Sequence, residues 1–236
     1  MAPPRAGAGA RFIGARPTPG ATLLLAIELA VFVVVFAVLG APVWVRDHLA
    51  LTPVRALGPE PWQLVTSGLT HLGGRQLISS LIGIWMFATA VEQRTARGRM
   101  LGLFAGAQVA GAIVIAAVGR LAAPHAVFDG CSAGVVGLVA AFGVLYGPVP
   151  LHLFGLVELR GRSVALGVLG LSYLVGLLNH DYVGLAGDTA GVAVGWALAS
   201  GAGTRLGVAW DRLRLWRLRR RYKVIPGGRD TRRYLN

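Results

Sequence analysis

The chain has 236 residues, of which 55% are hydrophobic and only 14% are charged, and its mean hydropathy is +0.63. A water-soluble domain of this length is rarely so apolar, so the composition argues against an ordinary soluble protein and predicts a membrane protein. The formal net charge of +13 comes mainly from eleven Lys and Arg residues within 205–236. Cys131 is the one cysteine, which excludes a disulfide within the chain.

Six segments approach the roughly 20 apolar residues that cross a bilayer as a helix. In chain order they are 21–41, 77–91, 100–118, 131–147, 164–178 and 182–202, and the second and fifth are short. We therefore predict an all-α, polytopic membrane protein with a bundle of six transmembrane helices in residues 21–204. A disordered Pro/Gly/Arg-rich segment, 1–20, precedes the bundle and a basic tail, 205–236, follows it.

The positive charges are concentrated on one side of this predicted bundle. Nineteen of the 23 Lys and Arg residues lie before the first apolar segment, after the sixth, or in the connections 92–99 and 148–163. Because Lys and Arg are retained on the cytoplasmic side, we expect both termini in the cytoplasm. The Ala/Gly/Arg-rich composition suggests a bacterium with GC-rich DNA, and hence a multi-pass protein of the bacterial cytoplasmic (inner) membrane.

The basic tail interleaves arginines with Leu213, Leu215, Trp216 and Leu218. This pattern suits an interfacial segment that contacts anionic lipid, and a disordered topology anchor is the alternative interpretation. We do not expect a nucleic-acid partner. Neither a metal nor a cofactor is indicated, because the five histidines show no ligand spacing.

The run Gly130-Cys131-Ser132-Ala133-Gly134 opens the fourth apolar segment directly after a polar loop. Small neighbours allow another helix to approach Ser132, and a helix N-terminus offers unpaired N–H groups to a developing oxyanion. Ser132 is therefore a candidate nucleophile. The alternative is an N-cap serine in a small-residue packing helix. For Asp129, just before this run, we expect a capping role.

The last apolar segment carries glycines four positions apart around an acid, in the run Gly187-Asp188-Thr189-Ala190-Gly191-Val192-Ala193-Val194-Gly195. Glycines at this spacing share one helix face, which predicts close packing against the fourth segment, where Gly134, Gly137 and Ala141 are also small. An acid within a span is costly and is usually functional or paired. Candidate partners for Asp188 across the helices are Ser132, Ser80 and Gln76.

Together with polar residues around the second segment, these runs resemble the rhomboid family of intramembrane serine proteases over about residues 21–203. Trp62, His71 and Glu92 stand at family positions, and Gly187, Gly191 and Gly195 do so in the last helix. Gly130 and Ser132 match the Gly-x-Ser-Gly motif, with Ala133 in place of its final glycine. Where the family has an arginine, a second histidine, an asparagine and the catalytic histidine, this chain has Gln63, Gln76, Ser80 and Asp188.

The resemblance implies that Ser132 is the nucleophile position and that Gln76 and Ser80 occupy the positions of the oxyanion donors. It also implies that Asp188 stands in place of the general base. An aspartate, with an ordinary pKa near ~4, is far from the ideal of a base that titrates near the working pH.

We therefore expect a catalytically degenerate relative, a pseudoprotease, which binds transmembrane segments of client membrane proteins. The alternative is an active intramembrane serine endopeptidase that uses Ser132 with Asp188 as an atypical partner. A third possibility is an unrelated six-span carrier, in which the otherwise unexplained Glu28 would share an aqueous cavity with Asp188.

Overall fold

The computed structural model describes residues 16–38, 42–153 and 157–201. The chain divides into two compact units between Ser200 and Gly201, and the fold that follows is that of the first unit. Most of the predicted disordered segment 1–20, and the whole predicted basic tail 205–236, lie outside the described residues.

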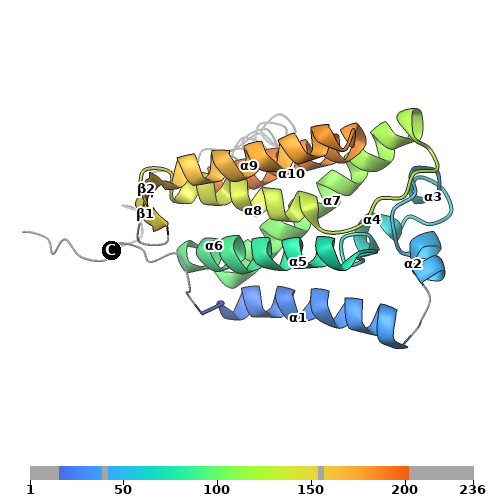
Figure 1. The fold of residues 1–236 in the computed structure, drawn as a ribbon, viewed down its shortest axis with the longest axis horizontal. Helices are drawn as coiled ribbons and strands as arrows, with labels where there is room; N and C mark the ends of the chain where they lie inside the picture. Colours follow the sequence, from blue (N-terminus) through green and yellow to red (C-terminus); the bar gives the residue numbers. More distant parts are fainter. Residues whose placement is uncertain (1–15, 39–41, 154–156, 202–236) are drawn as a thin grey trace, which may run out of the picture. The chain divides into compact units, whose positions relative to one another are not determined.

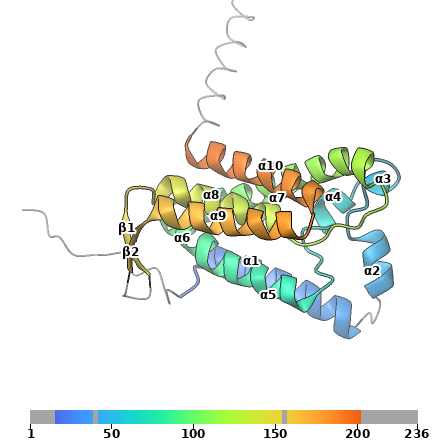
Figure 2. The same ribbon diagram turned by 45° about the horizontal axis from the view of Figure 1, so that its top comes forward.

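Long helical segments packed side by side make up the described part of this unit (Figures 1 and 2). They are α1 (Pro19–Val33) with its π-helical continuation η1 (Val34–Val38), the run α5 (Gly74–Gly83), η2 (Ile84–Ala88) and α6 (Thr89–Arg94), then α7 (Arg97–Ala122), α8 (Ser132–Leu145), α9 (Gly161–Leu178) and α10 (Tyr182–Ala199). α8 packs against α7, α9 and α10, while α1 lies along α5, η2 and α6. The predicted all-α membrane bundle is confirmed.

The helical segments among the described residues differ in length and in apolar content. Among the described residues, four helical segments are long and apolar enough to cross a bilayer, namely Pro19–Phe36, Gly74–Arg94, Arg97–Ala122 and Gly161–Leu178. α8 is apolar but has only 14 residues, and α10 carries a buried aspartate in its middle. The second and fifth predicted segments are short in sequence. In the structure, polar or small residues at their ends lengthen them to the helical segments Gly74–Arg94 and Gly161–Leu178.

The connections contain structure that the sequence prediction lacked. Three short helices, α2 (Pro42–His48), α3 (Pro53–Ala56) and α4 (Gln63–Thr66), fill the first long connection. At the opposite end of the bundle, β1 (Pro150–Leu153) pairs antiparallel with β2 (Val157–Arg160). Both strands alternate apolar and polar residues, but this strand signal is short and begins only a few residues after the apolar helix α8.

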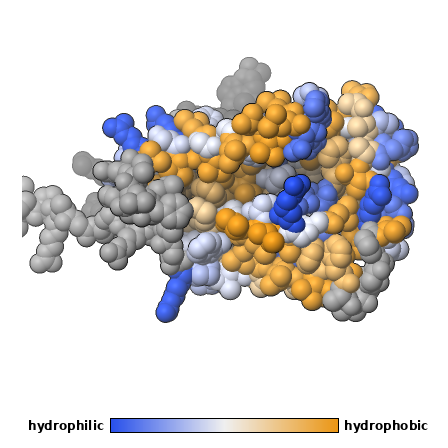
Figure 3. All heavy atoms as spheres, in the orientation of Figure 1, coloured by the Kyte–Doolittle hydropathy of each residue, from blue (hydrophilic) through white to orange (hydrophobic). Residues whose placement is uncertain are grey.

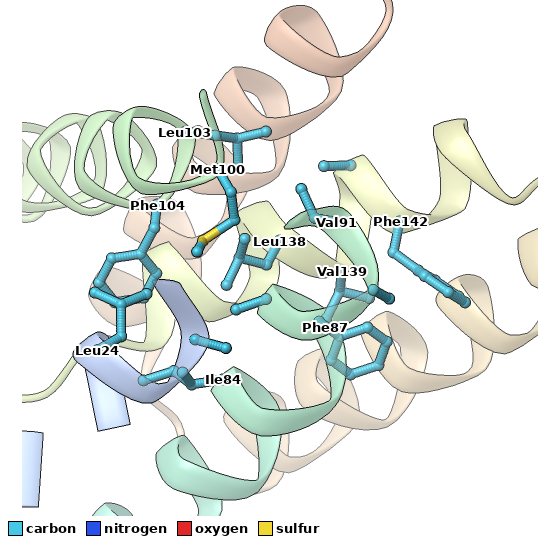
Figure 4. Packing of buried hydrophobic residues seen from close by; sticks show 14 of the residues in the cluster. Leu24, Ile84, Phe87, Val91, Met100, Leu103, Phe104, Leu138, Val139 and Phe142 are labelled. Carbon is cyan, nitrogen blue, oxygen red and sulfur yellow. The ribbon is translucent and has the colours of Figure 1, made fainter. Parts of the chain in front are cut away.

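The main apolar core lies between α1, η2, α6, α7 and α8 (Figure 4). Leu138 and Phe142 of α8 are fully buried in it. The Phe142 ring meets Phe87 edge to face at 5.4 Å and stacks on Tyr146 at 4.9 Å. At the end of the core the Arg94 guanidinium lies 4.5 Å from the centre of the Tyr146 ring. This packing fixes α8 in the interior of the bundle.

α10 approaches α8 and α7 so closely that only glycine fits at the contacts. A Cβ atom on Gly191 would collide with the backbone carbonyl of Ala133, and one on Gly195 with that of Gly137. Gly187 instead lies against Ile115 and the backbone of α7. The predicted glycine face is therefore present on α10, but it packs against two helices. Gly134 does not join it, because Gly134 lies against the ring of Phe104.

Glu92 at the end of α6 holds the beginning of α1. Its carboxylate accepts hydrogen bonds from the Thr18 hydroxyl and from the backbone N–H groups of Gly20 and Ala21. The first N–H groups of a helix have no partner within the helix, so the carboxylate caps α1 from a distant part of the chain. Arg97 Nε lies 3.7 Å from the same carboxylate.

The outer faces of the helices are apolar. Figure 3 shows hydrophobic residues over the middle of the helices and hydrophilic ones toward the ends. Large exposed apolar side chains include Leu29 of α1, Ile78 and Ile82 of α5, and Leu171, Leu174 and Leu178 of α9. Such a surface contacts the lipid bilayer, because apolar faces of this extent are not left in water.

Candidate functional site

Ser132 and Asp188 meet at the interface of α8 and α10. Ser132 begins α8 and is exposed to a cavity, while Asp188 lies in α10 with only 8% of its surface exposed. The Ser132 hydroxyl donates a hydrogen bond of 2.8 Å to Oδ1 of Asp188. The contact of Gly191 with the Ala133 backbone brings α10 close enough for this bond.

A cavity of about 540 Å³ opens over this pair. Its walls come from α5, α7, α8, α9 and α10 together with the loop before α8. Its polar lining includes Arg75, Gln76, Gln108, Asp129, Ser132 and Asp188. In Figure 3 pale and blue residues lie between the apolar surfaces of α9 and α5. A polar site is thus enclosed between two lipid-facing helices.

The two residues at the family's oxyanion positions have different places. Gln76 lines the cavity, and its Nε2 donates a hydrogen bond of 2.8 Å to the Asp129 carbonyl. Ser80 is buried, is not part of the cavity lining, and has its hydroxyl 3.1 Å from Nε2 of His71. The structure therefore brings Gln76, but not Ser80, to the cavity that contains Ser132.

His71 and Trp62 also lie away from the serine. His71 is buried between Ser80 and Glu28, with its Nδ1 3.5 Å from a carboxylate oxygen of Glu28. Trp62 is half exposed at the end of the bundle, and its indole N–H donates to the His48 carbonyl. Gln63 is fully buried and accepts a hydrogen bond from the Thr52 N–H. Glu92 caps α1 at the other end of the bundle.

Gly130 adopts a backbone angle φ of +84°, which favours glycine. Its N–H donates to the carbonyls of Ser67 and Thr70, and this fixes the loop before Ser132 against the α4–α5 connection. A Cβ atom here would also collide with the Gln76 side chain. The glycine at this motif position is therefore required by both the backbone angle and the available space.

Gln108 of α7 is a site residue that the sequence analysis missed. Its Nε2 donates to the Gly130 carbonyl at 3.2 Å, and its Oε1 accepts from the Gly134 N–H at 3.0 Å. The side chain thereby holds both ends of the first turn of α8, where Ser132 lies. The signal was a lone polar residue in an apolar segment, which usually marks a buried partner.

Asp129 does not cap α8, contrary to expectation. Its Oδ2 accepts a hydrogen bond of 2.8 Å from the Leu72 N–H, while the N-cap of α8 is Cys131, which makes no side-chain cap. Burial raises the pKa of Asp129, and the hydrogen bond from Leu72 partly offsets this effect. Asp129 thus joins the loop before α8 to the start of α5.

A family model, described as the Rhomboid domain, matches residues 58–204, which is more than half of the chain. The chain belongs to the rhomboid family. The match contains Ser132, Asp188 and the cavity lining other than Leu51, whereas α1 with Glu28 precedes it. No curated protein matches this rhomboid chain.

The chemistry that this rhomboid site offers is a serine paired with a carboxylate. Among the described residues, none of those lining the cavity is a histidine. A carboxylate orients a serine hydroxyl well, because it accepts a strong charge-assisted hydrogen bond from the hydroxyl group. It is less suited to removing that proton, because an ordinary aspartate is a much weaker base than imidazole.

Proposed function

We propose that this rhomboid protein is a pseudoprotease that binds transmembrane segments of client membrane proteins without cleaving them. One observation carries the proposal. The Ser132 hydroxyl is hydrogen-bonded to Asp188, and among the described residues no imidazole lines the cavity around it. A serine becomes a strong nucleophile when an adjacent base takes its proton, and the carboxylate in this place does so poorly.

The cavity supports the binding half of the proposal. α9 lines it with Ser172, Val175 and Gly176, and α5 lines it with Arg75 and Gln76. Both helices also carry large apolar side chains on their exposed faces. A transmembrane segment of a client would approach between these lipid-facing surfaces and place a polar or helix-breaking residue at the cavity.

We also infer the membrane in which the protein lies and its orientation there. Arg94, Arg97 and Arg162 lie in the terminal turns of α6, α7 and α9, and Arg160 ends β2, all at the end of the bundle that bears the β-hairpin. The positive-inside rule would put this end in the cytoplasm, with both termini there and the basic tail against anionic lipid. The Ala/Gly/Arg-rich composition favours a bacterial inner membrane.

Labelling with a fluorophosphonate probe tests the loss of catalysis. We expect no labelling of the purified protein in detergent, and labelling of Asp188→His, in which an imidazole could act on Ser132. The double variant Asp188→His with Ser132→Ala is the control and should not be labelled. Labelling of the native protein that disappears with Ser132→Ala would overturn the proposal.

Site-specific photo-crosslinking tests client binding. A photoreactive residue at Val175, which lines the cavity, should capture transmembrane segments in native membranes. The matched control is Leu166, which lies in the same helix, is 62% exposed and is not part of the cavity lining. Equal capture at both positions would contradict a binding site at the cavity.

The second candidate function is an active endopeptidase, and the 2.8 Å bond between Ser132 and Asp188 is the observation that favours it. In this alternative, Asp188 would accept the Ser132 proton, and Gln76 would donate a hydrogen bond to the oxyanion. The labelling experiment distinguishes the two functions. An active enzyme that uses the Asp188 carboxylate would be labelled in its native form and would lose the labelling in Asp188→Asn, whereas a pseudoprotease would not be labelled in either form.

A further inference from the structure

Behind the cavity lies a buried cluster of three different metal-ligating side chains, Glu28, His71 and Cys131. One ligand atom from each lies within 4.8 Å of the others. The residues are 1%, 2% and 0% exposed, respectively. None of the three lines the cavity over Ser132, so the cluster is a separate site.

Three separate parts of the fold supply the cluster. Glu28 comes from the inner face of α1, His71 from the connection between α4 and α5, and Cys131 from the position just before α8. They are 43 and 60 positions apart along the chain, so no spacing motif could show them. Ser80 borders the group, with its hydroxyl 3.1 Å from Nε2 of His71.

Protein groups satisfy only part of the cluster: His71 Nε2 lies 3.1 Å from the Ser80 hydroxyl, whereas His71 Nδ1 comes no closer than 3.5 Å to the Glu28 carboxylate. Both carboxylate oxygens of Glu28 and Nδ1 of His71 are buried without a hydrogen-bond partner. The Cys131 sulfur lies 3.9 Å from Nε2 of His71. Buried polar atoms are nearly always paired, and an unpaired carboxylate inside a membrane protein is especially costly. The arrangement therefore calls for a further positively charged partner.

A divalent cation fits this requirement. A Cys131 thiolate and a Glu28 carboxylate carry two negative charges, which a doubly charged ion would neutralise, while His71 binds as neutral imidazole. The mixture of sulfur, nitrogen and oxygen ligands suits zinc and disfavours magnesium and calcium, which take oxygen ligands. Zinc bonds of about 2.0–2.3 Å require the ligands to draw slightly closer together than they are here.

We propose that Glu28, His71 and Cys131 form a zinc site that joins α1 to the α4–α5 connection and to the start of α8. Zinc in proteins takes four ligands, so these three side chains would leave one position for the neighbouring Ser80 hydroxyl or a water molecule, and the complete burial suits an ion that holds the fold together. The ion would hold α1, which precedes the matched rhomboid domain, against the loop that positions Ser132. This site does not depend on whether Ser132 reacts.

The direct test measures the zinc content of the full chain. The protein is purified in detergent, incubated with Zn²⁺ and desalted, and its bound zinc is then measured by elemental mass spectrometry. We expect about one zinc ion per chain, and less than about a tenth of that in Cys131→Ser and in Glu28→Gln. The matched control is His48→Ala, which removes a half-exposed histidine that also pairs with a glutamate, Glu60, but has no cysteine beside it. Its zinc content should equal that of the native protein.

Cobalt titration of the native protein decides the question even if the variants do not fold. Co²⁺ in the site should produce a thiolate-to-metal charge-transfer absorption, and Cys131 is the only cysteine in the chain that can cause it. No stoichiometric zinc and no such absorption would overturn the proposal. The close approach of Glu28 and His71 would then be explained by a shared proton in place of a metal. Full zinc content in Cys131→Ser would also overturn the proposal, because the zinc would then be bound elsewhere in the chain.

Discussion

The Ser132 hydroxyl and the Asp188 carboxylate are joined by a 2.8 Å hydrogen bond although they are 56 positions apart in the chain. The bond depends on the distance between α8 and α10, which the absence of side chains at Gly191 and Gly195 permits. Helix packing and site geometry are therefore coupled, and substitutions that separate the helices should also separate the pair.

Gly191→Ala is expected to destabilise the bundle by about 1–3 kcal/mol, the usual cost of overpacking. The added methyl group would collide with the backbone carbonyl of Ala133, which cannot rotate away as a side chain can. Thermal unfolding in detergent measures the effect. Gly170→Ala on α9 is the matched control, because nothing lies within 4 Å of a Cβ atom there. Equal stability of the two variants would contradict the packing.

Gln108→Leu should lower the free energy of unfolding by about 1–3 kcal/mol, because it leaves the Gly130 carbonyl and the Gly134 N–H without their side-chain partner. It should also reduce probe labelling in the Asp188→His background, since the turn that holds Ser132 loosens. The exposed Gln93 provides the control substitution, Gln93→Leu. Unchanged labelling would show that Gln108 does not position the serine.

Glu92→Gln should release the beginning of α1. The amide has one acceptor oxygen in place of two, so the N–H groups of Gly20 and Ala21 cannot both keep their bonds. Loss of a charge-assisted cap costs about 1–2 kcal/mol. Backbone hydrogen exchange at residues 20–24 should become faster, whereas Glu60→Gln at the other end should leave it unchanged. Slow exchange in Glu92→Gln would exclude the capping role.

Asp129→Asn should change how stability depends on pH. Because burial raises the pKa of Asp129, the folded protein retains this proton at a pH at which the unfolded chain has lost it. The stability contribution of Asp129 is therefore greatest at low pH and falls as the pH rises from about 4 through the pKa of the folded protein.

Thermal unfolding of both proteins over a pH series measures this effect. The native protein should lose stability relative to Asp129→Asn as the pH rises, because asparagine does not titrate and can still accept the Leu72 hydrogen bond through its carbonyl oxygen. Parallel pH profiles would show that Asp129 titrates alike in the folded and unfolded states.

The sequence by itself determined that the chain is a helical membrane protein of the rhomboid family. Apolar segments and the glycine period on α10 are local features, and the motif residues around Ser132 and Asp188 occur in a recognisable order. Local patterns suffice for these conclusions, because the apolar face and the small residues of a helix can be identified from a few turns of its sequence.

The tertiary structure alone decided which polar residues meet. It paired Asp188 with Ser132 out of three candidates, turned Ser80 toward His71 and away from the cavity, and placed Gln108 under the first turn of α8. It also gathered Glu28, His71 and Cys131 from three parts of the chain. Such contacts depend on how far apart the packed helices lie and how each is rotated, and no spacing along the chain records these quantities.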